Sequence, residues 1–97
     1  MPAVRTPCYV VEWYRPELVE DEFSSALATL VDCVATMSSE GTPVRVLHTV
    51  TVPCDEVVFG VIAASSEAVV TELCRRAGVP PERLTAAVST RLTTAET

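Results

Sequence analysis

This chain of 97 residues is most informative in what it lacks. It contains no Lys, no Asn and no Gln, and its one histidine is His48. The absence of lysine excludes Schiff-base catalysis and the phosphate-binding loops that depend on a lysine. A single histidine excludes zinc fingers with two histidines and the metalloprotease helix with paired histidines. The three glycines are too far apart for a Gly-rich phosphate loop, and no Gly-x-Ser-x-Gly segment indicates a serine hydrolase.

Basic residues are also scarce, since seven Arg stand against 13 acidic residues and the net charge is −6. Such a chain repels phosphate groups, so we expect neither nucleic acid nor a membrane as a partner. The longest apolar run, residues 57–64, is too short to span a bilayer, and the first residues lack the apolar core of a signal peptide. We therefore expect a cytoplasmic protein that forms a single domain over residues 1–97, with an ordered core of about residues 7–92.

The cysteines are four in number, and no two are close enough to form a Cys-x-x-Cys pair. In a reducing cytoplasm we expect free thiols that pack mainly as small hydrophobic side chains. A four-cysteine metal site or a disulfide framework is the alternative. The positions are Cys8, Cys33, Cys54 and Cys74.

Hydrophobic periodicity predicts six elements. Strands are predicted by alternating or β-branched residues at 7–14, 44–52, 57–64 and about 84–92, and the third of these is apolar on both faces and therefore central. A first helix is predicted by apolar residues three and four apart between residues 23 and 37, and a second begins at Ser65 or Ser66 and ends at Gly78. This order predicts an α+β, ferredoxin-like βαββαβ fold, with two helices on one face of a four-stranded antiparallel sheet.

The second face of this sheet carries no helix, and we name it the open face. Large exposed apolar patches mark interfaces, so we expect two copies to pack through their open faces as a homodimer about a two-fold axis. The alternative is a monomer whose sheet face is less polar than usual. We expect the open face to carry Cys8, Val10, Glu12 and Tyr14 from the first strand and Val44, Val46, Val50 and Val52 from the second.

Two residues of the open face are candidate metal ligands. If alternation continues through the second strand, His48 shares this face with the valines, and a two-fold axis supplies a second copy of it. Glu12 adds a carboxylate from each chain, and imidazole with carboxylate suits Ni, Zn, Cu or Fe(II). The alternatives are a hydrogen-bonded core histidine, a Glu12 with a raised pKa that acts as a general acid or base, and a Glu12 that reaches solvent or an Arg.

Four segments, at residues 9–16, 46–50, 64–69 and 76–84, resemble those of a family of small bacterial ferredoxin-like proteins described as nickel-binding. Most members of that family have no known function. The similarity covers roughly residues 9–90, and its most specific parts are the Leu-His pair at residues 47–48 and the Ala-Gly-x-Pro segment at residues 77–80.

This resemblance implies a dimeric ferredoxin-like fold with a metal ion or small ligand at the open-face interface. It implies His48 as a ligand and Glu12 as a second one. The chain departs from the family's pattern at Gly60, where a cysteine or a bulkier residue is expected, and at Val46 and Val50, where aromatic residues are expected.

Together these observations favour a small dimeric binding protein that holds nickel, another divalent transition metal or a small ligand near His48. A second hypothesis is a cofactor-independent dimeric enzyme of the ferredoxin-like kind, in which His48 or Glu12 moves a proton in an apolar pocket. A third is a protein-interaction module whose open face binds a partner and no ligand.

Overall fold

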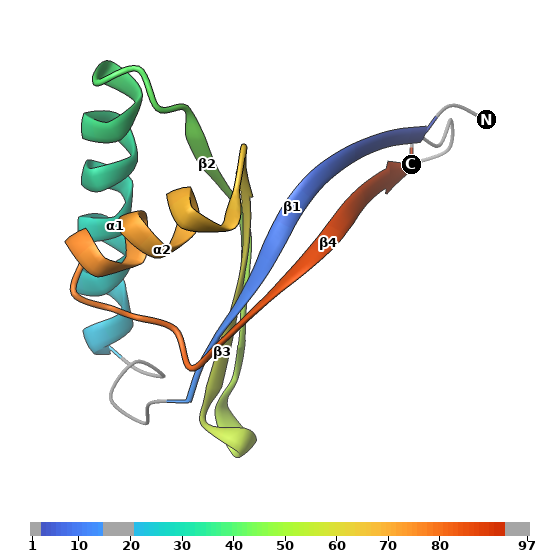
Figure 1. Cartoon of the computed structure of the whole chain (residues 1–97). Coiled ribbons are helices and arrows are strands. Elements are labelled where there is room, and N and C mark those ends of the chain that lie inside the picture. The colour runs from blue at the N-terminus through green and yellow to red at the C-terminus, as the bar shows by residue number, and fades with distance from the viewer. Residues whose placement is uncertain (1–2, 15–20, 93–97) are drawn as a thin grey trace.

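A computed structural model of the chain describes residues 3–14 and 21–92. The four strands form one antiparallel sheet in the order β2-β3-β1-β4, and both helices cover the same face of it (Figure 1). This is the α+β, ferredoxin-like βαββαβ arrangement predicted from the sequence. The elements are β1 (Ala3–Trp13), α1 (Asp21–Ser39), β2 (Val44–Val52), a short 3₁₀ helix η2 (Pro53–Asp55), β3 (Val57–Ala64), α2 (Glu67–Arg76) and β4 (Arg83–Leu92).

The bounds of β2 and β3 are those predicted, and β3 lies inside the sheet as its two apolar faces indicated. The prediction for β1 was wrong at its start, because the strand begins at Ala3 and not at Pro7. Proline removes one backbone donor, which suggests a strand end, yet a proline is accepted inside a strand wherever its position faces an unpaired edge. Among residues 3–14 and 21–92, no helix has the length and hydropathy needed to cross a membrane.

Helix α2 begins and ends with the signals expected of it. The Ser66 hydroxyl oxygen accepts a hydrogen bond of 3.4 Å from the Val69 N–H and caps the helix N-terminus. Gly78 follows the last turn with a φ of +76°, a left-handed conformation that glycine adopts without steric cost. The chain then turns back toward the sheet, and the Val79 N–H donates to the Cys74 carbonyl over 2.9 Å.

The core lies between the helices and the covered face of the sheet, and Trp13 is its largest member. Its indole is 1% exposed, and its Nε1–H donates a hydrogen bond of 2.7 Å to the Val79 carbonyl oxygen. Gly60 on β3 lies beneath this indole, because a Cβ built there would be 3.0 Å from the ring and 3.0 Å from Val11 Cγ2. The other buried residues of the cluster are Val11, Leu30, Met37, Val44, Val58, Ile62, Val70, Leu73, Cys74 and Val79.

A β-bulge at Leu47 changes which face each residue of β2 occupies. Val46 pairs with Ile62, but the next pair is His48 with Val61. Strand β2 therefore has one extra residue, Leu47, between two pairs that are adjacent on β3. The expectation that Val44, Val46, Val50 and Val52 all lie on the open face was therefore wrong. Val44 and Val46 pack in the core, whereas His48, Val50 and Val52 lie on the open face with Val61 and Phe59 of β3.

The far half of β1 and β4 forms a two-stranded extension that we name the ribbon, made of residues 3–8 and 87–92. These residues pair with each other, from Ala3 with Leu92 to Cys8 with Ala87, whereas the pairing of β1 with β3 begins only at Tyr9. Figure 1 shows the ribbon leaving the sheet and curving away from both helices. The remaining half of the same two strands lies within the sheet.

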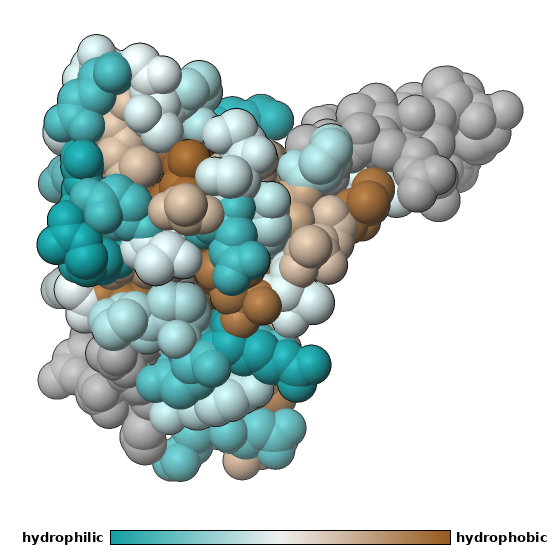
Figure 2. All heavy atoms as spheres, viewed as in Figure 1, coloured by the Kyte–Doolittle hydropathy of each residue, from teal (hydrophilic) through white to brown (hydrophobic). Residues whose placement is uncertain are grey.

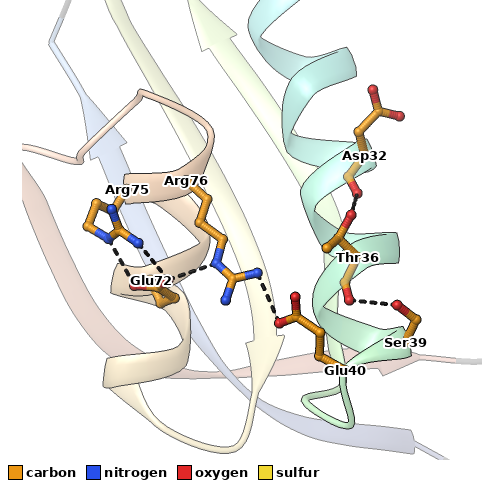
Figure 3. Close-up of polar contacts among 7 residues, drawn as sticks. All are labelled: Asp32, Thr36, Ser39, Glu40, Glu72, Arg75 and Arg76. Carbon is orange, nitrogen blue, oxygen red and sulfur yellow. Dashed lines mark hydrogen bonds and ion pairs between the residues drawn. The ribbon is translucent and has the colours of Figure 1, made fainter.

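A cluster of exposed charged residues joins the two helices (Figure 3). Glu72 contacts Arg75 at 2.8 Å and Arg76 at 2.7 Å, and Arg76 also reaches Glu40 at 3.0 Å, just beyond the end of α1. Hydrogen bonds from Arg75 and then Arg76 lower the pKa of Glu72 from 4.5 to about 2.

The lowered pKa of Glu72 predicts a specific acid dependence of stability. Its contribution is complete above pH 4.5 and is lost as the pH falls through 2, because the carboxylate that accepts these bonds becomes protonated. We expect Glu72→Gln to lower the thermal midpoint slightly at pH 6 and by clearly less at pH 2, where about half of the Glu72 carboxylate is protonated. Asp32→Asn is the control, since Asp32 extends its carboxylate away from the cluster (Figure 3). An equal effect of Glu72→Gln at both pH values would contradict the assignment.

The four cysteines are free thiols with different surroundings, and none of them forms the disulfide that the sequence left open. Cys8 and Cys74 are buried, Cys33 is half-buried, and Cys54 is exposed in η2. Burial raises the pKa of Cys74 to about 12.

These surroundings predict the order in which the thiols are alkylated. With iodoacetamide at pH 8, Cys54 reacts first in the native protein, whereas Cys74 reacts only after unfolding, because it is inaccessible and holds its proton. Peptide mass mapping after timed quenching measures each site. Cys54→Ser should abolish the fast phase, and rapid labelling of native Cys74 would show that the core opens far more often than its packing indicates.

Candidate functional site

The open face carries an apolar centre between two polar ends. Val10 on β1 lies opposite Val61 on β3, and Glu12 lies opposite Phe59. Their neighbours Val11 and Trp13 are in the core, so the alternation of a strand places Val10 and Glu12 on the face that the helices leave uncovered. The expected side of β1 is thus correct, although Cys8, which alternation places on the same side, is only 3% exposed. Val50, opposite Phe59 on the other side, is 44% exposed and extends the apolar centre to β2.

Glu12 lies at one end of this apolar centre and has two polar neighbours. Its side chain is 15% exposed, Oε1 accepts a hydrogen bond from the Tyr14 hydroxyl, and Oε2 lies 3.8 Å from Arg83 Nε. The hydrogen bond to Glu12 raises the pKa of Tyr14, so the phenol remains a donor at neutral pH. Tyr14 is held in turn by its backbone N–H, which donates to Glu82 Oε1 over 3.0 Å. This arrangement matches the alternative of a glutamate that reaches an Arg.

His48 lies at the opposite end of the apolar centre, on edge strand β2. The bulge at Leu47 places it opposite Val61, and its side chain is exposed. It shares the open face with Val50 as predicted, but not with Val46. An exposed imidazole on an edge strand is accessible to a ligand or to a second protein molecule, and the alternative of a buried core histidine does not apply.

One chain does not bring His48 and Glu12 together. The two residues lie on the strands that flank β3, and their partners on β3 are two residues apart. Standard strand spacing and rise then give a distance of about 12 Å between their Cα atoms. Phe59 and Val61 fill the interval. In the part of the chain that the structure describes, no three His, Cys, Asp or Glu side chains gather as a metal site. A site that uses both residues therefore takes them from two different copies.

The sequence missed two of the residues that define the Glu12 end. Arg83 contacts Glu12 only because β1 and β4 pair in the register that sets them opposite each other, and no local pattern reports such a register. Tyr14 was placed on the open face but not identified as the donor to Glu12. The available signal was that Tyr14 follows Glu12 by two residues, because side chains two residues apart on a strand lie on the same face and can contact each other.

A cavity at the base of the ribbon lies away from both candidates. It has a volume of about 400 Å³ and is lined by Pro7, Pro43 and Val44 among others. His48 and Glu12 do not line it.

Comparison of the chain with protein-family models, with curated proteins and with solved structures finds no match.

Proposed function

We propose that the chain is a small homodimeric binding protein whose ligand is held between two open faces. The observation that supports this is the composition of the open face, where a half-buried carboxylate and an exposed imidazole border an apolar centre of Val10, Val50, Phe59 and Val61. Apolar side chains on a sheet face without helices favour burial against a second surface. A second copy supplies the same surface, and a two-fold axis closes the assembly.

The ligand that best fits these donors is nickel or another divalent transition metal. Because His48 and Glu12 of one chain are too far apart to bind one ion, the proposed site takes His48 from one copy and Glu12 from the other. Face-to-face sheets pack about 10 Å apart, a gap that a histidine and a glutamate span from opposite sides. Imidazole and carboxylate are donors that nickel and zinc accept. The alternative within this proposal is a small polar ligand that binds to the same His48 and Glu12 side chains.

Native mass spectrometry with added Ni²⁺ or Zn²⁺ tests both parts of the proposal at once. A mixed site predicts a dimer with one ion per chain, whereas two His48 side chains on one ion predict one ion per dimer. His48→Ala should abolish uptake, and Thr49→Ala, on the same strand but opposite Gly60 on the face that the helices cover, is the matched control. Equal uptake by the wild-type protein and His48→Ala would overturn the metal site, and a monomer at micromolar concentration would overturn the dimer.

The dimer interface is tested separately by two valines of similar exposure. Val50 lies on the open face and is 44% exposed, whereas Val31 lies on α1 and is 54% exposed. Val50→Glu places a charge in the proposed interface and should shift the dimer to monomer in analytical ultracentrifugation, because an unpaired buried charge is costly. Val31→Glu should leave the dimer intact. Equal behaviour of the two variants would place the interface elsewhere.

A second candidate function is proton transfer at Glu12. The observation that favours it is that Glu12 combines an apolar neighbourhood with a hydrogen bond from Tyr14, an arrangement suited to a general base. It needs a substrate pocket that the second copy completes. In this case Glu12→Gln abolishes proton transfer to or from a bound substrate while binding of that substrate persists, whereas the metal-binding proposal expects loss of metal uptake.

A further inference from the structure

The ribbon is the part of the fold that has the least support from its own chain. Figure 1 shows it projecting from the sheet, with neither helix packed on it. Residues 3–8 of β1 pair with β4 and, within the described part of the chain, with no second strand. A two-stranded ribbon alone in water is at best marginally stable, and strands usually need a third strand or a packed layer.

Beyond the end of β3, β1 presents unpaired backbone groups along the edge that faces away from β4, and β4 is itself an outer strand of the sheet. Alternate residues of a strand direct their N–H and C=O groups to opposite edges. Glu12 directs its carbonyl toward β4, since this oxygen accepts a hydrogen bond of 2.8 Å from the Glu82 N–H. Arg5 and Pro7 are an odd number of residues from Glu12 and therefore face the other edge. Pro7 fits there because it has no N–H to pair. We name residues 3–7 of β1 the free edge.

The free edge leads into the cavity of about 400 Å³ at the base of the ribbon. Pro7 is part of the free edge and also lines the cavity. A strand paired with the free edge would therefore extend into the cavity. Its wall is mostly apolar, with Pro43, Val44, Ala63 and Ala64, and Arg45 also lines it. Figure 2 shows hydrophobic side chains exposed where the ribbon leaves the sheet. Backbone donors beside an apolar groove are the arrangement that binds an added β-strand.

We propose that the ribbon is an arm with which the chain holds a second copy of itself. In the dimer, an extended segment of the partner pairs with the free edge and lies in the adjoining groove, and the two-fold axis makes the contact reciprocal. The inference rests on the homodimer proposed above and adds a second contact surface to it. It gives a reason for β1 and β4 to extend six residue pairs beyond the end of their pairing with β3.

The area of the interface favours a second copy as the occupant. The planar area of two stacked open faces is about 1,000 Å², from strands about 4.8 Å apart that rise about 3.3 Å per residue. That is below the roughly 1,200–2,000 Å² of stable protein interfaces. Two ribbons, each laid against the partner, add about 800 Å² on the same dimensions and bring the total into this range. The open face alone lies near the lower limit for a stable dimer, and the ribbon enlarges the interface.

Amide hydrogen exchange, measured residue by residue by NMR at several concentrations, tests the arm directly. The Arg5 N–H should exchange rapidly in the monomer and about 15-fold more slowly at a total chain concentration about 100 times the dimer Kd, where about 7% of the chains remain monomeric. The Cys8 N–H faces β4 and is the internal reference. An unprotected Arg5 N–H in a protein that ultracentrifugation shows to be dimeric would overturn the arm and leave the open-face dimer standing. A monomer at every concentration would overturn both.

A pair of substitutions at Arg5 separates backbone pairing from side-chain contacts. Arg5→Pro removes the N–H at the free edge, as Pro7 already does, and should raise the dimer Kd about tenfold or more because two hydrogen bonds are lost per dimer. Arg5→Ala keeps the N–H and should leave the Kd within about threefold of the wild-type value. Far-UV circular dichroism checks that both variants fold. Equal Kd values for the two folded variants would exclude backbone pairing along the free edge.

Discussion

Replacing Trp13 with alanine lowers the free energy of unfolding by about 3–5 kcal/mol, the range for large aromatic residues in protein cores. Trp13 is 1% exposed and joins β1 to the segment after α2 through its hydrogen bond to the Val79 carbonyl. Its loss leaves a cavity over Gly60 that the rigid sheet cannot close. For a domain of about 100 residues, this change lowers the thermal midpoint by more than about 10 °C.

Urea unfolding followed by far-UV circular dichroism measures this effect, because the variant has no tryptophan left for fluorescence. Trp13→Phe is the matched control. It keeps an aromatic ring but removes the donor to Val79, and we expect a smaller loss of about 1–3 kcal/mol for the unpaired carbonyl. A loss below about 1 kcal/mol for Trp13→Ala, well under the usual cost of such a truncation, would show that the indole is not part of the core.

Adding a methyl group at Gly60 destabilises the protein by about 1–3 kcal/mol, the usual cost of overpacking a core. A Cβ at this position would lie 3.0 Å from both the Trp13 ring and Val11 Cγ2, and both neighbours are buried in the core, at 1% and 0% exposed. Glycine inside a strand ordinarily costs stability relative to alanine, so Gly60→Ala would be favourable without this contact. The sign of the change is therefore diagnostic.

A double-mutant cycle with Trp13 isolates the contact. In Trp13→Leu the ring is absent, so Gly60→Ala should cost far less there than in the wild-type background, with a coupling free energy of about 0.5–3 kcal/mol. Urea midpoints of the four proteins supply the measurement. Strict additivity would show that Gly60 is required for another reason. The contact explains why this chain has a glycine at the point where the resemblance led us to expect a larger side chain.

Much of the fold was predictable from the sequence because it depends on local patterns. The periodicities of residues 44–52 and 57–64 are those of strands, and the structure confirms both with the same bounds. Ser66 and Gly78 mark the two ends of α2 through capping and a left-handed φ, which are local backbone effects. The side of β1 that belongs to the open face follows from simple alternation and is likewise confirmed.

The candidate site was less predictable, because its geometry depends on pairing between distant residues. The bulge at Leu47 cannot be read from β2 alone, since it exists only relative to β3. The contact of Arg83 with Glu12 requires the β1–β4 register, which joins residues about seventy positions apart. The sequence thus identified His48 and Glu12 as candidates, but it could not predict that they lie about 12 Å apart on the open face.

The sequence by itself determined the order of the elements, the fold class and the exclusion of lysine-dependent chemistry and of sites that need several histidines from one chain. These follow from which residues are present and from their local periodicity. Only the tertiary structure decided that Val46 and His48 lie on opposite faces, that Trp13 covers Gly60, and that β1 and β4 continue into a ribbon. The physical reason is that local patterns constrain each strand separately, whereas register, bulges and strand ends depend on the free energy of pairing two distant segments.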